Sequence, residues 1–337
     1  MQHLVSFYKS IFFYPIVIAL LLFAAVWYEM GYEALFLVVI LSVLETTLSF
    51  DNAVVNAKIL DRMDPVWQKR FLTWGILIAV FGTRFALPVL IVSVAVWTSP
   101  MSIAVLAYTD PVAYGVLLEG VHSAITAFGG VFLLMVSLKY FFDHAKSVHW
   151  IQSVESHLVR WGRIEAIEIA IALVLLLVLS SVTAFDQATV LVAGLIGLLL
   201  FIVMEGIASS LSVESSEVAA QGATLFVYLN VLDSAFSLDG VIGAFALSSD
   251  LMVIVIGLGI GAYFVRTLTV YFVVKKTLAQ LKYLEHGAHW AIFGLAIAML
   301  LGLVMHVPEI VTGLTGLFFV LFAYYSSIRS MKHQKSL

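Results

Sequence analysis

Apolar stretches, each about the length of a membrane-spanning helix, recur along the whole chain. A helix that crosses a bilayer needs about 20 mostly apolar residues. Ten segments meet this requirement: 11–28, 34–57, 71–96, 122–142, 164–183, 188–209, 222–246, 251–274, 288–306 and 309–326. Residues 97–121 are apolar but contain Pro100, Asp110 and Pro111, so we expect an extramembrane or re-entrant segment there. The pattern predicts an all-α polytopic membrane protein with about ten transmembrane helices.

The composition agrees with this prediction. Of the 337 residues, 62% are hydrophobic and 11% are charged, whereas soluble proteins carry roughly 25% charged residues. The chain has no cysteine, which excludes disulfides and thiolate metal ligands. We expect a single membrane domain over residues 1–337. No small-residue cleavage site follows the first apolar segment, so we interpret that segment as a transmembrane helix rather than a signal peptide.

The basic residues predict an orientation, because cytoplasmic loops collect Lys and Arg. With a cytoplasmic N-terminus, 15 of the 17 basic residues fall on the cytoplasmic side and the opposite loops carry none. These are Lys9, Lys58, Arg62, Lys69, Arg70, Lys139, Lys146, Arg160, Arg163, Lys275, Lys276, Lys282, Arg329, Lys332 and Lys335. We therefore expect a multi-pass protein of the plasma (inner) membrane with both termini in the cytoplasm.

Two acidic motifs with one spacing indicate an internal repeat. "ETTLSFDNAVV" begins at Glu45 and "DSAFSLDGVIG" begins at Asp233, an offset of 188 residues. The motifs lie in the second and the seventh predicted helix, and this odd offset of five makes the copies cross the membrane in opposite directions. We therefore predict an inverted-topology repeat with halves of approximately 11–183 and 188–326. In such repeats an ion site lies near the midplane between the halves.

The motifs supply a candidate metal site. A charged side chain at the centre of a spanning helix costs about 2.5–3.5 kcal/mol on insertion scales, so intramembrane acids are functional candidates. The candidate ligands are the acids and amide Glu45, Asp51, Asn52, Asp233 and Asp239, with the hydroxyls of Ser49 and Ser237. These are hard oxygen donors, which suit Mg²⁺, Ca²⁺ or Mn²⁺.

Helical spacing leaves two arrangements open. At about 100° per residue, Glu45, Ser49, Asn52 and Asn56 share one stripe, and Asp51 lies about 120° away from it. Asn230, Asp233, Ser237 and Gly240 form the matching stripe in the second copy, with Asp239 displaced from it in the same way. Either each displaced Asp faces a second neighbour, such as an arginine, or the helix is broken at Ser-x-Asp. Gly240 and Gly243 would ease a break in the second copy, whereas the first copy has no equivalent glycine.

Arg84 and Arg266 fall within the predicted helix that follows each motif. They would offset negative charge when the site is empty, or orient a carboxylate. In the alternative interpretation, Glu45 and one of the aspartates, Asp51 or Asp239, merely pair with the two arginines and hold the bundle together.

Three further residues are candidates for an access path. Glu205 lies near the cytoplasmic end of its predicted helix, in an acidic stretch that could concentrate cations. Glu119 and His122 lie together near the outer side, where they could serve as an exit-side ligand and a pH-sensitive group. A solvated helix end and an interfacial histidine are the simpler interpretations of these residues.

The paired Asp motifs resemble those of the TerC family of integral membrane proteins, which is named for tellurite resistance and is related to the lysine-exporter type transporters. "FGGVFLLMVSLKYFFD" (128–143) and "LKYLEHGAHWAIFGLAIAML" (281–300) also resemble family segments. The resemblance extends from about residue 35 to 326 and implies export of a metal ion, most of all manganese. The second motif departs from the Asp-Ser-Ile-Pro-Ala of many members, because Gly240 follows Asp239 here.

These observations predict a membrane transporter that exports a divalent cation, favouring Mn²⁺, through a carboxylate site between two repeats. The alternative is a metal-binding membrane scaffold of a stress or tellurite-resistance complex that does not transport. We find no glycine-rich nucleotide loop, no Ser-His-Asp arrangement and no HExxH motif, so we expect neither an enzyme nor a prosthetic group. The expected partners are the cation and the lipid bilayer, with no nucleic acid. A homo-oligomer or a partner in a membrane complex stays open.

Overall fold

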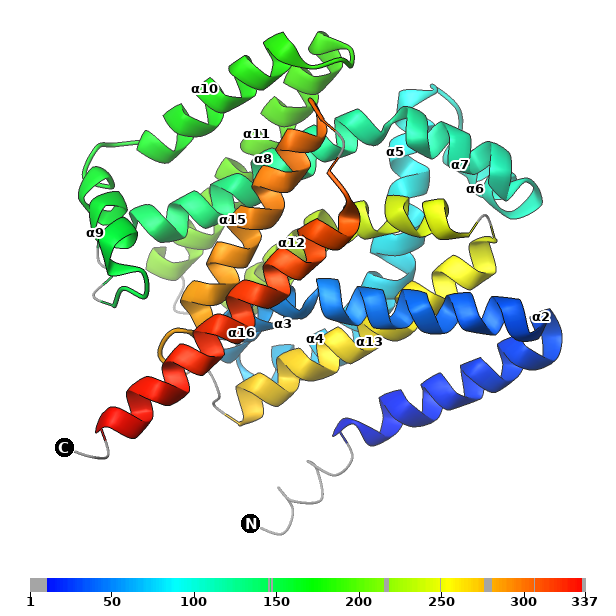
Figure 1. The fold of residues 1–337 in the computed structure, drawn as a ribbon, viewed down its shortest axis with the longest axis horizontal. Helices are drawn as coiled ribbons and strands as arrows, with labels where there is room; N and C mark the ends of the chain where they lie inside the picture. The colour runs from blue at the N-terminus through cyan, green and yellow to red at the C-terminus, as the bar shows by residue number, and fades with distance from the viewer. Residues whose placement is uncertain are drawn as a thin grey trace.

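The computed structural model describes residues 11–144, 146, 148–214, 218–248, 250–275, 281–305 and 307–334, and over these ranges it consists of helices and their connections, with no strand (Figure 1). The helices are α2 (Phe13–Leu48), α3 (Phe50–Asp61), α4 (Pro65–Leu77), the π-helix η1 (Ile78–Ala86), α5 (Leu87–Ala95), α6 (Pro100–Thr109), α7 (Pro111–Gly120), α8 (His122–Phe142), α9 (Gln152–Trp161), α10 (Ile167–Val182), α11 (Gln187–Glu214), α12 (Val218–Leu247), α13 (Leu251–Val274), α15 (Leu284–Gly302) and α16 (Glu309–Gln334). Within these residues, seven helices are long and apolar enough to cross a bilayer. The chain is therefore an all-helical, multi-pass membrane protein, and the number of ten crossings stays a prediction.

The first two predicted segments form the two arms of α2. Gly31 has φ 87° and ψ −175° inside this helix, a conformation that only glycine adopts readily. The chain doubles back at this point, and α3 continues the second arm (Figure 1). The turn separates segments 11–28 and 34–57, as the hydropathy pattern predicts.

Residues 97–121 form two short helices, α6 and α7. Each begins with a capping side chain followed by proline. Ser99 Oγ accepts a hydrogen bond from Ser102 N at 3.2 Å, and Asp110 Oδ1 accepts one from Ala113 N at 3.0 Å. A helix of ten residues is about 15 Å long, half of the ~30 Å hydrocarbon core. Neither helix can span the bilayer, in agreement with the predicted interruption.

The bundle has a central helix pair and a second pair packed closely beside it. α8 and α15 contribute most of the largest apolar cluster, together with α10 and α11. In the second pair, α13 packs against the second arm of α2. A Cβ atom at Gly261 would lie 2.5 Å from Glu45 Cβ, and Ser42 Oγ donates to Gly257 O at 3.1 Å. Small residues spaced by four allow this close backbone approach, and it places Glu45 directly against α13.

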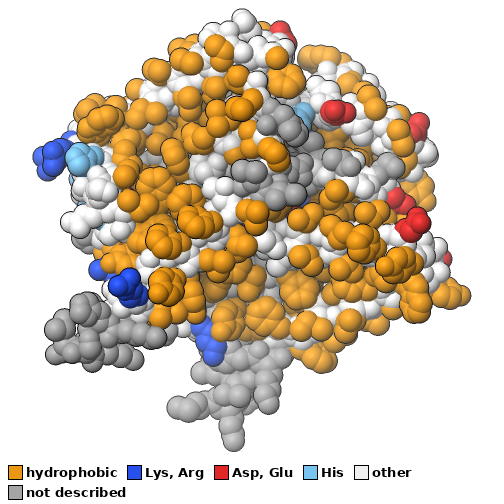
Figure 2. Space-filling view, in the orientation of Figure 1, with side chains coloured by type: hydrophobic (Ala, Val, Ile, Leu, Met, Phe, Trp, Pro, Cys, Tyr) orange, Lys and Arg blue, Asp and Glu red, His pale blue; other side chains and the backbone are white. Residues whose placement is uncertain are grey.

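Charged side chains gather at opposite ends of the bundle. Figure 2 shows hydrophobic side chains over most of the visible face, with Lys and Arg at the end near α9 and the end of α16. Asp and Glu gather at the end near α6, α7 and the turn of α2. A wide apolar face between two polar ends is the surface expected for a protein embedded in a bilayer.

A buried glutamate attaches the connecting helix α9 to α15. Glu155 is fully buried and accepts hydrogen bonds from Trp150 N at 3.2 Å and Trp290 Nε1 at 3.1 Å. Its Oε2 lies 2.8 Å from His286 Nδ1 and 3.0 Å from Lys146 Nζ. Burial by itself raises the pKa of Glu155, but the hydrogen bonds from His286, Lys146 and Trp290 hold its pKa far below the ordinary value of 4.5.

We predict that Glu155→Gln destabilises the protein by about 3–5 kcal/mol, because it leaves the buried cation of Lys146 without its counter-charge. Because the folded-state pKa is lowered, the stabilisation is present above pH 4.5 and is lost only as pH falls through the lowered value. Thermal unfolding in detergent at pH 5 and pH 7 measures the loss, which should be equal at the two pH values because both lie above 4.5. The exposed Glu165→Gln is the control, and an equal effect of the two substitutions would contradict the prediction.

Candidate functional site

The first acidic motif lies at a kink between α2 and α3. Ser49 separates the two helices with φ −94° and ψ 17°, yet Ser49 N still donates to Glu45 O at 3.0 Å and Ala53 N to Ser49 O at 3.2 Å. The second motif lies inside α12, which is continuous from Val218 to Leu247. The interruption therefore occurs in the motif without glycine and is absent from the motif with Gly240, the reverse of the expectation. The helix preference against glycine is only about 1 kcal/mol, and tertiary packing overrides it.

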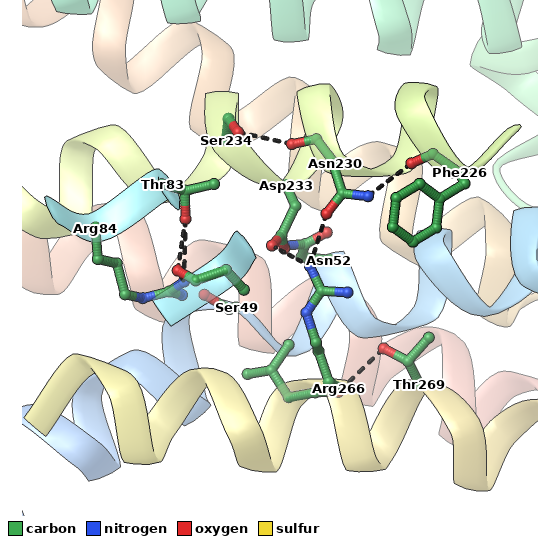
Figure 3. A network of polar contacts seen from close by, with 12 residues as sticks. Ser49, Asn52, Thr83, Arg84, Phe226, Asn230, Asp233, Ser234, Arg266 and Thr269 are labelled. Carbon is green, nitrogen blue, oxygen red and sulfur yellow. Dashed lines mark hydrogen bonds and ion pairs between the residues drawn. The ribbon is translucent and has the colours of Figure 1, made fainter. Parts of the chain in front are cut away.

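Glu45 forms an ion pair with Arg84, and both side chains are buried. Arg84 belongs to the π-helix η1, a wide helical form that often occurs at functional sites. Its Nη2 donates to Glu45 Oε1, while its Nη1 donates to Ala79 O at 2.6 Å and to Thr83 Oγ1 at 3.3 Å (Figure 3). On the other side, Ser49 Oγ donates to Glu45 Oε1 at 3.0 Å. Arg84 is thereby held by a carboxylate, a carbonyl and a hydroxyl.

Asp233 forms the second ion pair, with Arg266 of α13 (Figure 3). Arg266 Nη2 lies 2.9 Å from Asp233 Oδ2 and 3.4 Å from Asn230 Oδ1. Asn52 Nδ2 donates to Asp233 Oδ1 at 2.7 Å, which links α3 to α12. We call the two ion pairs with Asn52 and Asn230 the acid–arginine network. Each arginine pairs with the first acid of its motif, so Arg266 does not pair with Asp51 as one alternative expected.

Asp51 points away from the acid–arginine network, toward α16. A Cβ atom at Gly316 would lie 3.7 Å from Asp51 Oδ2, and 3.8 Å from Ala291 Cβ of α15. Asp51 is 3% exposed, and its Oδ1 has no hydrogen-bond partner. Of the two arrangements left open, Asp51 therefore takes the one in which it faces a second neighbour, here α16 and not an arginine, because a residue next to Asn52 on a helix points in another direction. The side chain of Asp239 lies outside the described residues.

Several polar atoms beside the acid–arginine network are buried without a hydrogen-bond partner. They are Asn52 Oδ1, Ser237 Oγ, and both polar side-chain atoms of Asn56. An unsatisfied buried polar group costs about 1–3 kcal/mol, so such atoms mark a place for water or an ion. Among the described residues, no three His, Asp or Glu side chains are arranged to hold a metal ion. Any cation bound here would need amide and hydroxyl oxygens in addition to carboxylates.

The proposed access-path residues have no interaction with the acid–arginine network in the described structure. Glu205 lies 3.9 Å from Lys139 Nζ in a half-exposed pair. Glu119 is exposed near the end of α7, and His122 is the half-buried first residue of α8. These positions agree with helix ends and do not test a role in cation access.

Sequence reasoning did not place Asn56, Asn230, Gly75 or Phe71 in the site. Helical spacing predicted that Asn56 and Asn230 lie on the polar stripes of the two motifs, although it did not name them as ligands. Gly75 and Phe71 of α4 contact Arg266, and the local sequence gives no signal of this contact.

We predict that Arg84→Gln destabilises the folded protein by about 3–5 kcal/mol, because it leaves Glu45 as an unpaired buried charge. The double variant Glu45→Gln/Arg84→Gln should lose clearly less than the sum of the two single variants. Unfolding measurements on the three variants in detergent test this coupling. Additive losses would show that the ion pair is not a cooperative unit.

Comparison with known proteins identifies the family of the chain. Residues 50–334 match the family described as "Protein of unknown function (DUF475)". The matched region begins one residue before Asp51 and includes Asp233, Arg84 and Arg266, whereas Glu45 precedes it. Comparisons with curated proteins and with solved structures gave no significant match. Because the match covers most of its length, the chain belongs to the DUF475 family of proteins of unknown function.

Proposed function

We propose that this protein is a transporter that exports a divalent cation, Mn²⁺ in the first place, across the plasma (inner) membrane. In this proposal ten transmembrane helices form two inverted repeats, and the cation binds between α3 and α12. The observation that carries the proposal is the reciprocal contact of the two acidic motifs around unpartnered buried oxygens.

The reciprocal contacts support a twofold relation between the motifs. Asn52 of the first motif donates to Asp233 of the second. Gly240, 188 residues after Asn52, lies against Glu45, since a Cβ atom there would be 3.3 Å from Glu45 Oε2. Position 52 thus contacts position 233 while position 240 contacts position 45, the exchange that a twofold axis produces. Each first acid also pairs with an arginine of its own half.

The charge of the motifs supports a divalent cargo. The four acids of the two motifs and the two arginines carry a formal charge of −2, which one divalent cation would neutralise. The carboxylate of Asp233 and the unpartnered Asn52 Oδ1 and Ser237 Oγ are hard oxygen atoms, while Asp51, which faces α16, adds negative charge beside Asn52. Such donors bind Mn²⁺, Mg²⁺ and Ca²⁺ rather than Zn²⁺ or Cu²⁺. The preference for Mn²⁺ rests on the resemblance to the TerC family.

Apolar clusters on both sides of the acid–arginine network support alternating access. One cluster contains Leu60, Leu229 and Val270, and the other contains Leu41, Val241 and Leu258. Along α2–α3, Glu45 lies between Leu41 of one cluster and Leu60 of the other. In the same way, Asp233 lies between Leu229 and Val241 along α12. Arg266 lies between Leu258 and Val270 along α13. Opening one cluster while the other stays closed would expose the site to one side at a time, as rocking of one repeat against the other requires.

A metal-binding scaffold that does not transport is the second candidate, since the same oxygens could hold a structural ion. Flux separates the two candidates, because a scaffold binds the cation without moving it. An intramembrane enzyme and a carrier of anions have no supporting observation among the described residues.

We predict Mn²⁺ uptake into inside-out proteoliposomes, with competition from Mg²⁺ and Ca²⁺. Asp51→Asn and Asp239→Asn should each lower the flux at least about tenfold, because each removes one of the negative charges that would attract the cation. Asp186→Asn, in an exposed cap of α11, is the control. Unchanged flux in both motif variants would exclude these ligands. Tight binding without flux in the wild type would favour the scaffold.

The orientation generates a separate prediction. The chain has no cysteine, so single cysteines can be introduced without a background signal. Cysteines at the exposed Arg62 and Lys282 should react with a membrane-impermeant maleimide from the cytoplasmic side, and a cysteine at Trp97 from the outer side. Labelling of residues 62 and 282 from opposite sides would refute the topology and the inverted repeat together.

A further inference from the structure

Arg266 occupies a position that a bound cation could take. Its Nη2 lies between two oxygens of α12, 2.9 Å from Asp233 Oδ2 and 3.4 Å from Asn230 Oδ1 (Figure 3). Asn52 joins the same place, because its Nδ2 donates to Asp233 Oδ1 while its Oδ1 has no partner. One carboxylate oxygen and one amide oxygen therefore contact one guanidinium nitrogen, and Asn52 holds the other oxygen of the same carboxylate.

Arg266 is held less completely than Arg84. Arg266 is 2% exposed, and both its Nε and its Nη1 lack a hydrogen-bond acceptor. In Arg84 only Nε lacks one, because Nη1 donates to Ala79 O and Thr83 Oγ1. Unmade hydrogen bonds of a buried charged group are costly. The ion pair of Arg266 is therefore the easier of the two to exchange for another partner.

Helix α4 also contacts Arg266 in the position that it takes beside Asp233. The Phe71 ring centroid lies 4.2 Å from Arg266 Cζ, within the range of a cation–π interaction. A Cβ atom at Gly75 would overlap Arg266 Nη1, so glycine leaves the space into which the guanidinium extends. Phe71 and Gly75 therefore accommodate the guanidinium in the same position in which its Nη2 pairs with Asp233.

We propose that Arg266 is an internal cation that occupies a cargo position formed by Asp233, Asn230 and Asn52 and that leaves it when a divalent cation binds. The proposal rests on the proposed function and adds Asn230 to the ligands. A divalent ion and a guanidinium cannot share one carboxylate oxygen, because like charges at contact distance repel strongly in a low dielectric. Binding therefore displaces the Arg266 guanidinium from Asp233, and release of the cation lets Arg266 return and neutralise Asp233.

The test measures Mn²⁺ affinity of the purified full-length protein in detergent by calorimetry. Arg266→Gln should bind Mn²⁺ about tenfold or more tightly than the wild type, because the competing charge is absent. Arg84→Gln should tighten binding by less than threefold, since Arg84 does not occupy the cargo position. Adding Asn230→Leu to Arg266→Gln should remove most of the gain, which a purely structural arginine would not cause.

Gly75→Ala provides a test that keeps the charge of Arg266 and removes only its space. The overlapping atom is the end of a flexible side chain, so we expect a folded protein with Mn²⁺ affinity about threefold tighter and slower flux. Gly259→Ala is the matched control, because its Cβ would meet only Val80, at 3.1 Å.

The outcomes distinguish this inference from the proposed function. Equal or weaker Mn²⁺ binding in both Arg266→Gln and Gly75→Ala, with wild-type flux present, would overturn the role of Arg266 and leave the transporter intact. Tighter binding in both variants without flux in the wild type would support the role of Arg266 in a scaffold. Absence of Mn²⁺ binding in every variant would overturn both.

Discussion

The whole arrangement depends on the neutralisation of charges buried inside the helix bundle. Glu45 and Asp233 are each less than 5% exposed, and a buried carboxylate without a partner is destabilising by several kcal/mol. Arg84 and Arg266 meet this requirement from the neighbouring η1 and α13. Because an ion pair fixes its two helices relative to each other, the pairs define how α2 and α12 lie against the rest of the bundle.

Close helix packing makes the ion pairs geometrically possible. Gly257 and Gly261 bring the backbone of α13 against α2, next to Ser42 and Glu45. At Gly75 of α4, the Arg266 guanidinium occupies the space that a side chain would fill. Glycine is unfavourable in a helix by about 1 kcal/mol, and here that cost is offset by the contacts that the missing side chain permits.

The two halves use the same residue types to different effect. Both terminal nitrogens of Arg84, Nη1 and Nη2, have hydrogen-bond acceptors. In Arg266 only Nη2 has acceptors, and the guanidinium also contacts the Phe71 ring. Asp51 pairs with neither arginine; its Oδ2 lies against α16, and its Oδ1 has no hydrogen-bond partner. In the transporter that we propose, the Glu45–Arg84 pair would stay in place. The Asp233–Arg266 pair and Asp51 would respond to a bound cation.

The sequence by itself determined which segments are helical and apolar, because hydropathy over about 20 residues reports the environment of a segment directly. It also identified the buried acids and both arginines, since ionisable residues are rare in such segments. The gap between segments 11–28 and 34–57 predicted the turn of the chain at Gly31. Only the tertiary structure decided that Arg266 pairs with Asp233, that Asp51 faces α16, that the kink falls at Ser49, and that Gly75 makes room for a guanidinium. Periodicity fixes the angle of a side chain around its own helix, but its partner depends on how helices distant in sequence approach and rotate, and that is set by packing contacts which no local stretch of sequence contains.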